Sequence, residues 1–240
     1  MAVPTVILIA GADSFGTEGS LKNGLGGPQS ALQQLGFTVD EANAAAVVVC
    51  TYNDWDAFSG YLNGASNLDL EIKRFIKNGP VVVLAHSFGS VAAVYWNQHY
   101  AVKSGIDPSQ LQFVLLGNSV RPNNGLCAQW QMYTQPLASS IFPIIDGARE
   151  YDKWADSPNL LWSSGYLAAM FNAAQGDQFS YPTIHVTYDH VRLDDPTAAK
   201  IVLGNITYLL WKTNDPIPDP QYGRSLIATA YNRIVPAPAW

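Results

Sequence analysis

The stretch that decides the fold is Val81-Val82-Val83-Leu84-Ala85-His86-Ser87-Phe88-Gly89-Ser90, which leads directly into Val91-Ala92-Ala93-Val94-Tyr95-Trp96. Its run of β-branched and apolar residues predicts a buried strand, and the small residues around Ser87 predict a tight turn before a helix. A strand, a sharp turn with a serine and a helix together form a nucleophile elbow, in which a strained turn exposes the serine hydroxyl. The sequence therefore predicts that Ser87 is a nucleophile.

The turn departs in one place from the usual G-x-S-x-G pattern of such elbows. Ala85 stands in the first glycine position, whereas Gly89 keeps the second. Alanine is still small enough to leave room for a crossing backbone. The alternative is an ordinary buried strand followed by a Ser-Phe-Gly-Ser turn, and the apolar run directly before the serine favours the elbow.

Composition and charge narrow the class of protein. The 240 residues suffice for one α/β domain, and 48% hydrophobic with 13% charged residues is typical of a globular chain. A net charge of -6, with no basic cluster beyond Lys73, Arg74 and Lys77, argues against nucleic-acid partners. Two cysteines, Cys50 and Cys127, exclude a disulfide framework.

The amino-terminal segment indicates how the chain is made. Residues 1–12 are apolar but lack the basic region of a signal peptide, and no apolar run reaches the length of a membrane span. We therefore expect a soluble protein made without a signal peptide.

Strand and helix patterns alternate along the chain. Buried strands are predicted over 4–10, 45–51, 81–84 and 111–116, and helices over 28–35, 69–77, 165–174 and 196–211, the last capped by Asp194 or Asp195. Residues 126–162 show no clear periodicity and are interpreted as loops and short elements. This alternation predicts an α/β fold with a mostly parallel sheet covered by helices, formed by a single domain at 1–213 with a proline-rich extension at 214–240.

A glycine-rich loop over residues 11–19 follows the first predicted strand. It has neither the Lys-Ser/Thr pair of a P-loop nor the G-x-G-x-x-G spacing of a dinucleotide site. We expect it to donate backbone N–H groups to an oxyanion.

A serine nucleophile needs a base and an acid that orients the base. His86 adjoins Ser87 but is expected to point elsewhere, and His99 lies about 18 Å further along the predicted helix. His185 and His190 therefore remain as candidate bases. The candidate acids between the serine and these histidines are Asp146, Glu150, Asp152, Asp156 and Asp177. Spacing does not choose among them, although a turn at 151–158 could bring Asp152 or Asp156 to an imidazole.

Three further motifs carry a resemblance to a known family: Gly117-Asn118-Ser119-x-Arg121-Pro122-Asn123-x-Gly125, Tyr151-Asp152-x-Trp154-Ala155-Asp156-x-Pro158 and His185-x-x-Tyr188. With the elbow, they resemble the PE-PPE-type serine hydrolases of mycobacteria and the related cutinase-like esterases, including the lysin B enzymes of mycobacteriophages. Ser119 stands where those relatives often have proline.

The resemblance implies a cutinase-like α/β-hydrolase fold and a carboxylic ester hydrolase that needs no cofactor or metal. It implies Asp156 as the acid and His185 as the base, with Asp152 and His190 as second choices. It also implies that the backbone N–H groups of Asp13 and Phe88 form the oxyanion hole.

The resemblance further implies a lipid ester as substrate. A lysin B-like enzyme would cleave mycolyl-arabinogalactan at the mycobacterial cell envelope, and Met1 directly before the first strand favours this context. The alternative is a PE-PPE-type lipase or esterase of mycobacterial origin that acts on short- to medium-chain acyl esters. A third hypothesis is a non-catalytic binding or virion structural module on the same fold.

Overall fold

The protein is described here from a computed structural model. It describes residues 4–9, 11, 59–122, 124–149, 152, 154–156, 188 and 191–212, together with the backbone of 47–50. The predicted helices at 28–35 and 165–174 and the predicted extension at 214–240 lie outside these residues.

A seven-stranded sheet forms the centre of the described part of the chain, with strand order β2-β1-β3-β4-β5-β7-β6. Its strands are β1 (Thr5–Ile9), β2 (Val47–Cys50), β3 (Val81–His86), β4 (Leu111–Leu116), β5 (Ile144–Arg149), β6 (Ala199–Leu203) and β7 (Ile206–Trp211). All neighbouring strands pair in parallel except β6 and β7, which are antiparallel. The predicted mostly parallel α/β sheet is confirmed.

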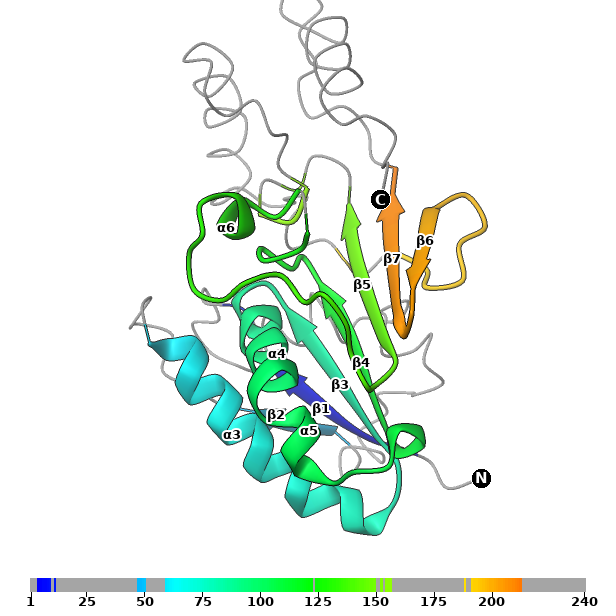
Figure 1. Cartoon of the computed structure of the whole chain (residues 1–240). Coiled ribbons are helices and arrows are strands. Elements are labelled where there is room, and N and C mark those ends of the chain that lie inside the picture. Colours follow the sequence, from blue (N-terminus) through cyan, green and yellow to red (C-terminus); the bar gives the residue numbers. More distant parts are fainter. Residues whose placement is uncertain are drawn as a thin grey trace, which may run out of the picture.

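The helices of the described residues are α3 (Gly60–Phe75), α4 (Phe88–His99), α5 (Ala101–Ser104) and α6 (Leu126–Gln129), with 3-10 turns η3 (Ile76–Asn78) and η4 (Pro108–Gln110). Figure 1 shows α3 and α4 side by side against one face of the sheet. The helix predicted at 69–77 is therefore the end of a longer one. None of the helices in the described segments has the length and apolar character that a membrane span requires.

Two hydrophobic clusters lie on the two faces of the sheet. Ile7 and Ile9 of β1 pack with the residues of α3 and α4, whereas Val6 and Leu8 pack in a second cluster with Tyr188 and Trp211. This division follows from the alternation of side chains along a strand. The strands are nonetheless apolar throughout because both faces are covered, as expected for parallel sheets.

The prediction of a helix at 196–211 was wrong. These residues form the β6–β7 hairpin, in which Leu203 pairs with Ile206 across Gly204 and Asn205. Gly204 has a φ of 57°, which glycine adopts without the strain that a side chain would add. Asp195 accepts hydrogen bonds from the backbone N and Oγ1 of Thr197, at 2.8 and 2.7 Å, in a turn that no helix follows.

One further finding differs from the expectations. Residues 144–149 form β5 inside the region interpreted as loops and short elements.

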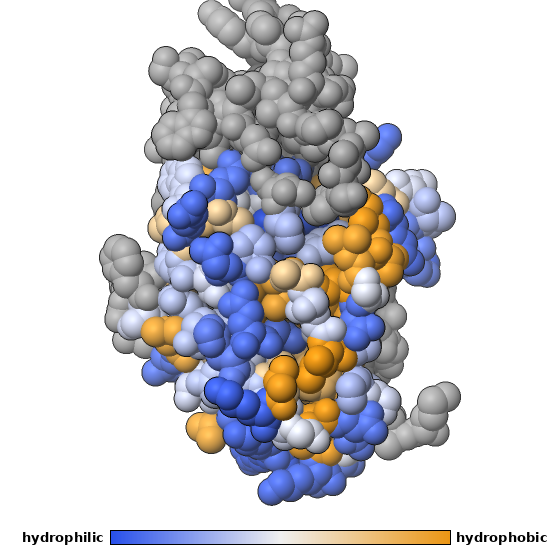
Figure 2. All heavy atoms as spheres, viewed as in Figure 1, coloured by the Kyte–Doolittle hydropathy of each residue, from blue (hydrophilic) through white to orange (hydrophobic). Residues whose placement is uncertain are grey.

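The outer strand β6 exposes 56% of Val202 and 45% of Leu203, and Figure 2 shows hydrophobic surface over this edge of the sheet. Cys127, in α6, is buried and forms no disulfide bond.

Candidate active site

Ser87 lies between β3 and α4 in a conformation that residues with side chains rarely adopt. Its φ and ψ are 54° and -123°, and such a conformation costs about 1–3 kcal/mol. The surrounding structure holds it in place, because the Ser87 backbone N donates to the Leu116 carbonyl at 2.9 Å. The Ser90 hydroxyl donates to the same carbonyl at 3.2 Å. The strand, the strained serine and the helix therefore have the geometry of a nucleophile elbow.

Gly11 lies directly against the Ser87 side chain. A Cβ atom at position 11 would lie 2.7 Å from Ser87 Cβ, 3.2 Å from Ser87 Oγ and 3.5 Å from His86 Nδ1. No side chain fits there without displacing a neighbour. Gly11, two residues beyond the end of β1, therefore lies in close contact with the elbow serine. Asp13, the predicted oxyanion donor on that loop, lies outside the described residues.

Phe88 is the first residue of α4, where the backbone N–H groups carry the positive end of the helix dipole. Its side chain is buried and packs edge-on against Tyr61 and Tyr133, with ring centroids 6.3 and 5.2 Å away. Tyr133 has a positive φ of 63°. An aromatic cluster of Phe88, Tyr61 and Tyr133 thus adjoins the residue next to the serine.

Asp152 is completely buried beyond the end of β5. Its Oδ1 accepts from the backbone N of Trp154 at 2.9 Å and of Ala155 at 3.2 Å, and its Oδ2 accepts from the Tyr188 hydroxyl at 2.6 Å. The Tyr188 hydroxyl in turn accepts from the Arg149 backbone N at 3.2 Å. Burial and the Asp152 charge raise the Tyr188 pKa well above its usual value, so the hydroxyl stays protonated and continues to donate.

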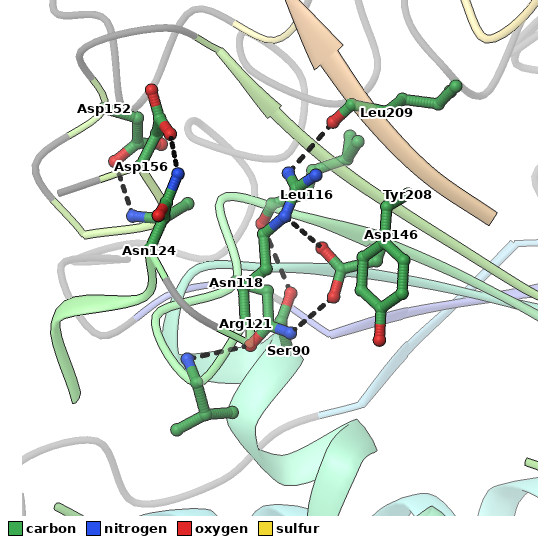
Figure 3. A network of polar contacts seen from close by, with 12 residues as sticks. Ser90, Leu116, Asn118, Arg121, Asn124, Asp146, Asp152, Asp156, Tyr208 and Leu209 are labelled. Carbon is green, nitrogen blue, oxygen red and sulfur yellow. Dashed lines mark hydrogen bonds and ion pairs between the residues drawn. The ribbon is translucent and has the colours of Figure 1, made fainter. Parts of the chain in front are cut away.

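Asp156 is also buried, with 1% of its surface exposed. Its Oδ1 accepts from Asn124 Nδ2 at 2.8 Å, and its backbone N donates to the Asp152 carbonyl at 2.7 Å. Figure 3 shows the Asn124 amide pointing toward Asp156. The two candidate acids therefore belong to one short turn but have different side-chain partners.

A buried polar network supports the loop that carries Asn124 (Figure 3). Asn118 Nδ2 donates to Asp146 Oδ2 at 2.8 Å, and Arg121 Nε lies 3.9 Å from Asp146 Oδ1. Arg121 Nη1 donates to the Leu209 carbonyl of β7 at 2.9 Å. Burial raises the Asp146 pKa, and the Arg121 charge and the Asn118 hydrogen bond oppose this rise.

Burial also raises the pKa of Tyr208, which neighbours this network, to about 12. Asp146 thus acts in this network and is not placed in the turn of Asp152 and Asp156.

The candidate histidines divide into those the structure describes and those outside it. His86, the last residue of β3, lies against Tyr188 with ring centroids 5.6 Å apart. His99 ends α4 and packs on Tyr95 with a centroid distance of 4.1 Å. His185 and His190 lie outside the described residues.

The contact between His86 and Tyr188 connects the elbow with the acid turn. The Tyr188 hydroxyl bonds to Asp152, and the Asp152 carbonyl accepts from the backbone N of Asp156. Tyr188 is also the last residue of the His185-x-x-Tyr188 motif, so one end of that motif lies at this site. The described residues hold no group of three or more His, Cys, Asp or Glu side chains that could bind a metal ion.

The sequence model of the PE-PPE domain matches residues 38–218. The chain belongs to this family. A curated relative, "Esterase PE16" from Mycobacterium tuberculosis (strain ATCC 25618 / H37Rv), is 31% identical over 215 residues, which cover 73% of this chain and 39% of the relative. The chain thus spans less than half of that relative's length.

One solved structure similar to this PE-PPE domain is described as a novel cutinase-like protein from Cryptococcus sp.. It shares 17% identity and a TM-score of 0.42, over 65% of this chain and 80% of that one. The family match confirms the resemblance to the PE-PPE family that the sequence motifs indicated.

Sequence reasoning about this PE-PPE domain missed two residues of the site. Gly11 was expected only as part of a loop, and the structure places it on the serine. Asn124 lay at an unassigned position within the motif at 117–125, and the structure places its amide on Asp156. The signal for Asn124 was its position in a polar motif after a buried strand, but its partner is 32 residues away.

Proposed function

We propose that this PE-PPE domain is a carboxylic ester hydrolase with Ser87 as its nucleophile. The observation that carries the proposal is the backbone of Ser87, with φ 54° and ψ -123° at the junction of a central strand and a helix. A non-glycine residue held in such strain commonly marks a functional site. Gly11, which leaves space for the Ser87 side chain and no more, supports the same role.

In the proposed reaction, Ser87 Oγ attacks the ester carbonyl while His185 takes the hydroxyl proton and Asp156 orients the imidazole. The backbone N–H groups of Phe88 and Asp13 stabilise the oxyanion. Collapse of the tetrahedral intermediate breaks the ester bond, and His185 gives its proton to the leaving alcohol. Water then attacks the acyl-enzyme by the same route, which releases the carboxylic acid and restores the Ser87 hydroxyl.

The two candidate acids have different hydrogen-bond partners. Both oxygens of Asp152 already accept bonds that order its own turn and hold Tyr188. An acid that orients a histidine must present an oxygen to the imidazole. Asp152 therefore has a role in holding Tyr188 and its own turn, whereas the resemblance to the PE-PPE-type hydrolases favours Asp156 as the acid.

We propose an acyl ester of a lipid as the substrate. The aromatic cluster of Tyr61, Phe88 and Tyr133 next to the serine, with Trp130 nearby in sequence and 42% exposed, supports an apolar acyl group. Membership of the PE-PPE family, and the name of the relative, favour the acyl-ester esterase over the lysin B-like alternative. Mycolyl-arabinogalactan of the cell envelope, the substrate of the lysin B-like alternative, is therefore tested as a second substrate.

The test combines a fluorophosphonate probe with hydrolysis of p-nitrophenyl butyrate. We expect the wild-type protein to be labelled at one serine, Ser87→Ala to lose both labelling and hydrolysis, and Ser90→Ala to remain labelled. Folded wild-type protein that is neither labelled nor active would refute the enzyme and favour the non-catalytic module. Triacylglycerols of graded chain length and purified mycolyl-arabinogalactan then distinguish the substrates by the acid that is released.

Single substitutions test the acid and the base. Asp156→Asn should lower kcat by about 10⁴-fold, the order expected when the orienting acid of a triad is lost. Asp152→Asn should instead lower the free energy of unfolding by about 1–3 kcal/mol, because it disturbs buried hydrogen bonds. His185→Ala should abolish turnover while His190→Ala retains most of it, and the opposite result would move the assignment.

A further inference from the structure

Asn124 makes a side-chain contact that the proposed triad does not use. Its Nδ2 donates to Asp156 Oδ1 at 2.8 Å. An ionised carboxylate accepts hydrogen bonds and donates none, so the amide must present its NH₂ group to it. A hydrogen bond to a charged acceptor is about twice as strong as one between neutral groups, and it favours the charged form of the carboxyl.

The main chain around Asn124 is fixed by short-range contacts. The Asn124 backbone N donates to the Pro122 carbonyl at 2.9 Å, and Gly125 N donates to the Arg121 carbonyl at 3.1 Å. A Cβ at Gly125 would lie 2.5 Å from the Ser119 carbonyl oxygen and 2.6 Å from Arg121 N, so the loop is closely packed on itself. The buried Arg121 side chain also ties this loop to β7. Asn124 is thus presented by a rigid support, which is what orientation of another side chain requires.

The loop that carries Asn124 is also joined to the acid turn by its backbone. Leu126 N donates to the Trp154 carbonyl at 2.9 Å. The Asn124 side chain is therefore not needed merely to bring the two segments together. It contributes a hydrogen-bond donor aimed at one carboxylate oxygen.

From these contacts we propose that Asn124 is a positioning residue for Asp156, whose amide holds the carboxylate in one orientation and in its anionic form while the other groups of the triad act. The inference rests on the proposed ester hydrolase and adds a residue that acts through the acid. If Asn124 positions Asp156, a change at Asn124 must alter the protonation or the orientation of the base. A purely structural residue at this place would not have that effect.

The pH dependence of kcat/KM distinguishes a positioning role from a structural one. Asn124→Asp keeps the shape of the side chain and places a second carboxyl group beside Asp156, which adds a negative charge wherever both groups are ionised. An added negative charge stabilises the protonated base, so the acid limb of the profile should move to higher pH by about one unit. For a base with an ordinary pKa of about 6.5, this shift should lower kcat/KM about threefold at pH 7 and about tenfold well below pH 6.

Asn124→Leu tests the donor without adding charge. Loss of a hydrogen bond to a charged group should lower kcat about 10- to 100-fold while KM changes little, because the orientation of the acid matters in the transition state. The rate of fluorophosphonate labelling of Ser87 should fall in parallel. Gln129→Leu is the matched control, because Gln129, the last residue of α6, donates from Nε2 to the main-chain carbonyl oxygen of Asn124 at 3.3 Å. Its kcat/KM and pH profile should remain within about twofold of the wild type.

Circular dichroism and thermal unfolding first establish that each variant is folded. If Asn124→Asp does not fold, the kcat loss and labelling rate of Asn124→Leu decide the matter. Wild-type kcat and an unshifted pH profile in the folded Asn124 variants, with Ser87 still labelled, would overturn the positioning role and leave the esterase intact. Full hydrolysis by Ser87→Ala would instead refute the esterase mechanism, and the role of Asn124 with it.

Discussion

The close approach of Gly11 to Ser87 leads to a quantitative prediction for Gly11→Ala. The new Cβ would lie 2.7 Å from Ser87 Cβ, whereas carbon atoms in favourable contact are about 3.5–4.0 Å apart. The two atoms must therefore separate by about 1 Å. The Ser87 backbone N donates a hydrogen bond to the Leu116 carbonyl. Ile9, the last residue of β1, pairs with Ala85 of β3. Because both sides are anchored, the displacement should reach the serine itself.

A misplacement of about 1 Å at a reacting group can cost about 100-fold in rate. We therefore expect Gly11→Ala to lose about two orders of magnitude in kcat on p-nitrophenyl butyrate. Overpacking should also lower the free energy of unfolding by about 1–3 kcal/mol. Stopped assays give kcat and KM, the fluorophosphonate labelling rate reports on the Ser87 hydroxyl alone, and urea titration gives the stability.

Gly105→Ala is the matched control for the loss of stability. Gly105 has a φ of 68°, and a Cβ there would meet nothing within 4 Å. The substitution should cost about 1–2 kcal/mol through backbone strain and leave kcat and labelling unchanged. If Gly11→Ala retained kcat and labelling within threefold of the wild type, the elbow would be free to adjust, and the argument from close packing at the serine would be wrong.

Three other predictions concern the buried groups of the sheet. Because the folded pKa of Tyr208 is about 12 against an ordinary 10.0, folding stability should fall as pH rises from 10 to 12, by about 2–3 kcal/mol; Tyr208→Phe should remove this part of the alkaline loss in urea titrations. Asp146 has a raised pKa, so its contribution to stability should decrease as pH rises above 3.8; the stability of Asp146→Asn relative to wild type should improve over that range, and a flat difference would contradict this. A Cβ at Gly147 would lie 2.3 Å from the Trp211 ring, so Gly147→Ala should lower Tm and alter tryptophan fluorescence, at a cost of about 1–3 kcal/mol.

The central strands could be predicted because buried parallel strands are continuous apolar runs, and β1, β2, β3 and β4 all have this form. β5 could not, because Asp146 and Gly147 interrupt its pattern. The structure explains both interruptions, since Asp146 bonds to Asn118 and Gly147 makes room for Trp211. Neither partner is near β5 in the sequence.

The hairpin at β6 and β7 was missed for a different reason. Its apolar residues fall at spacings that also suit one face of a helix, and the prediction followed that period. The Gly204-Asn205 pair between two β-branched runs is the local signal that distinguishes the hairpin. The turn residues at 204–205 thus determine that this segment is a hairpin, and the helix-like spacing of its apolar residues is coincidental.

The candidate site could be proposed from the sequence where it depends on neighbouring residues, and not where it depends on contacts between distant segments. The elbow is a local feature, so Ser87 could be selected from ten neighbouring residues. Asp152 and Asp156 lie in the same turn and have the same chemistry, so no spacing rule separates them. Their hydrogen-bond partners, Tyr188 for one and Asn124 for the other, separate them in three dimensions.

The buried pair of Arg121 and Asp146 is best understood through the loop it supports. A buried ion pair contributes little net stability, because removing both charges from water costs about as much as their attraction returns. This pair is long, at 3.9 Å, and Asp146 Oδ1 has no hydrogen-bond partner among the residues that the structure describes. A contribution to folding stability therefore does not explain why this ion pair is present. Its geometric effect is specific, since Arg121 reaches the Leu209 carbonyl and fixes the path of the chain four residues before Gly125. That path determines where Asn124 lies, and hence which oxygen of Asp156 it meets.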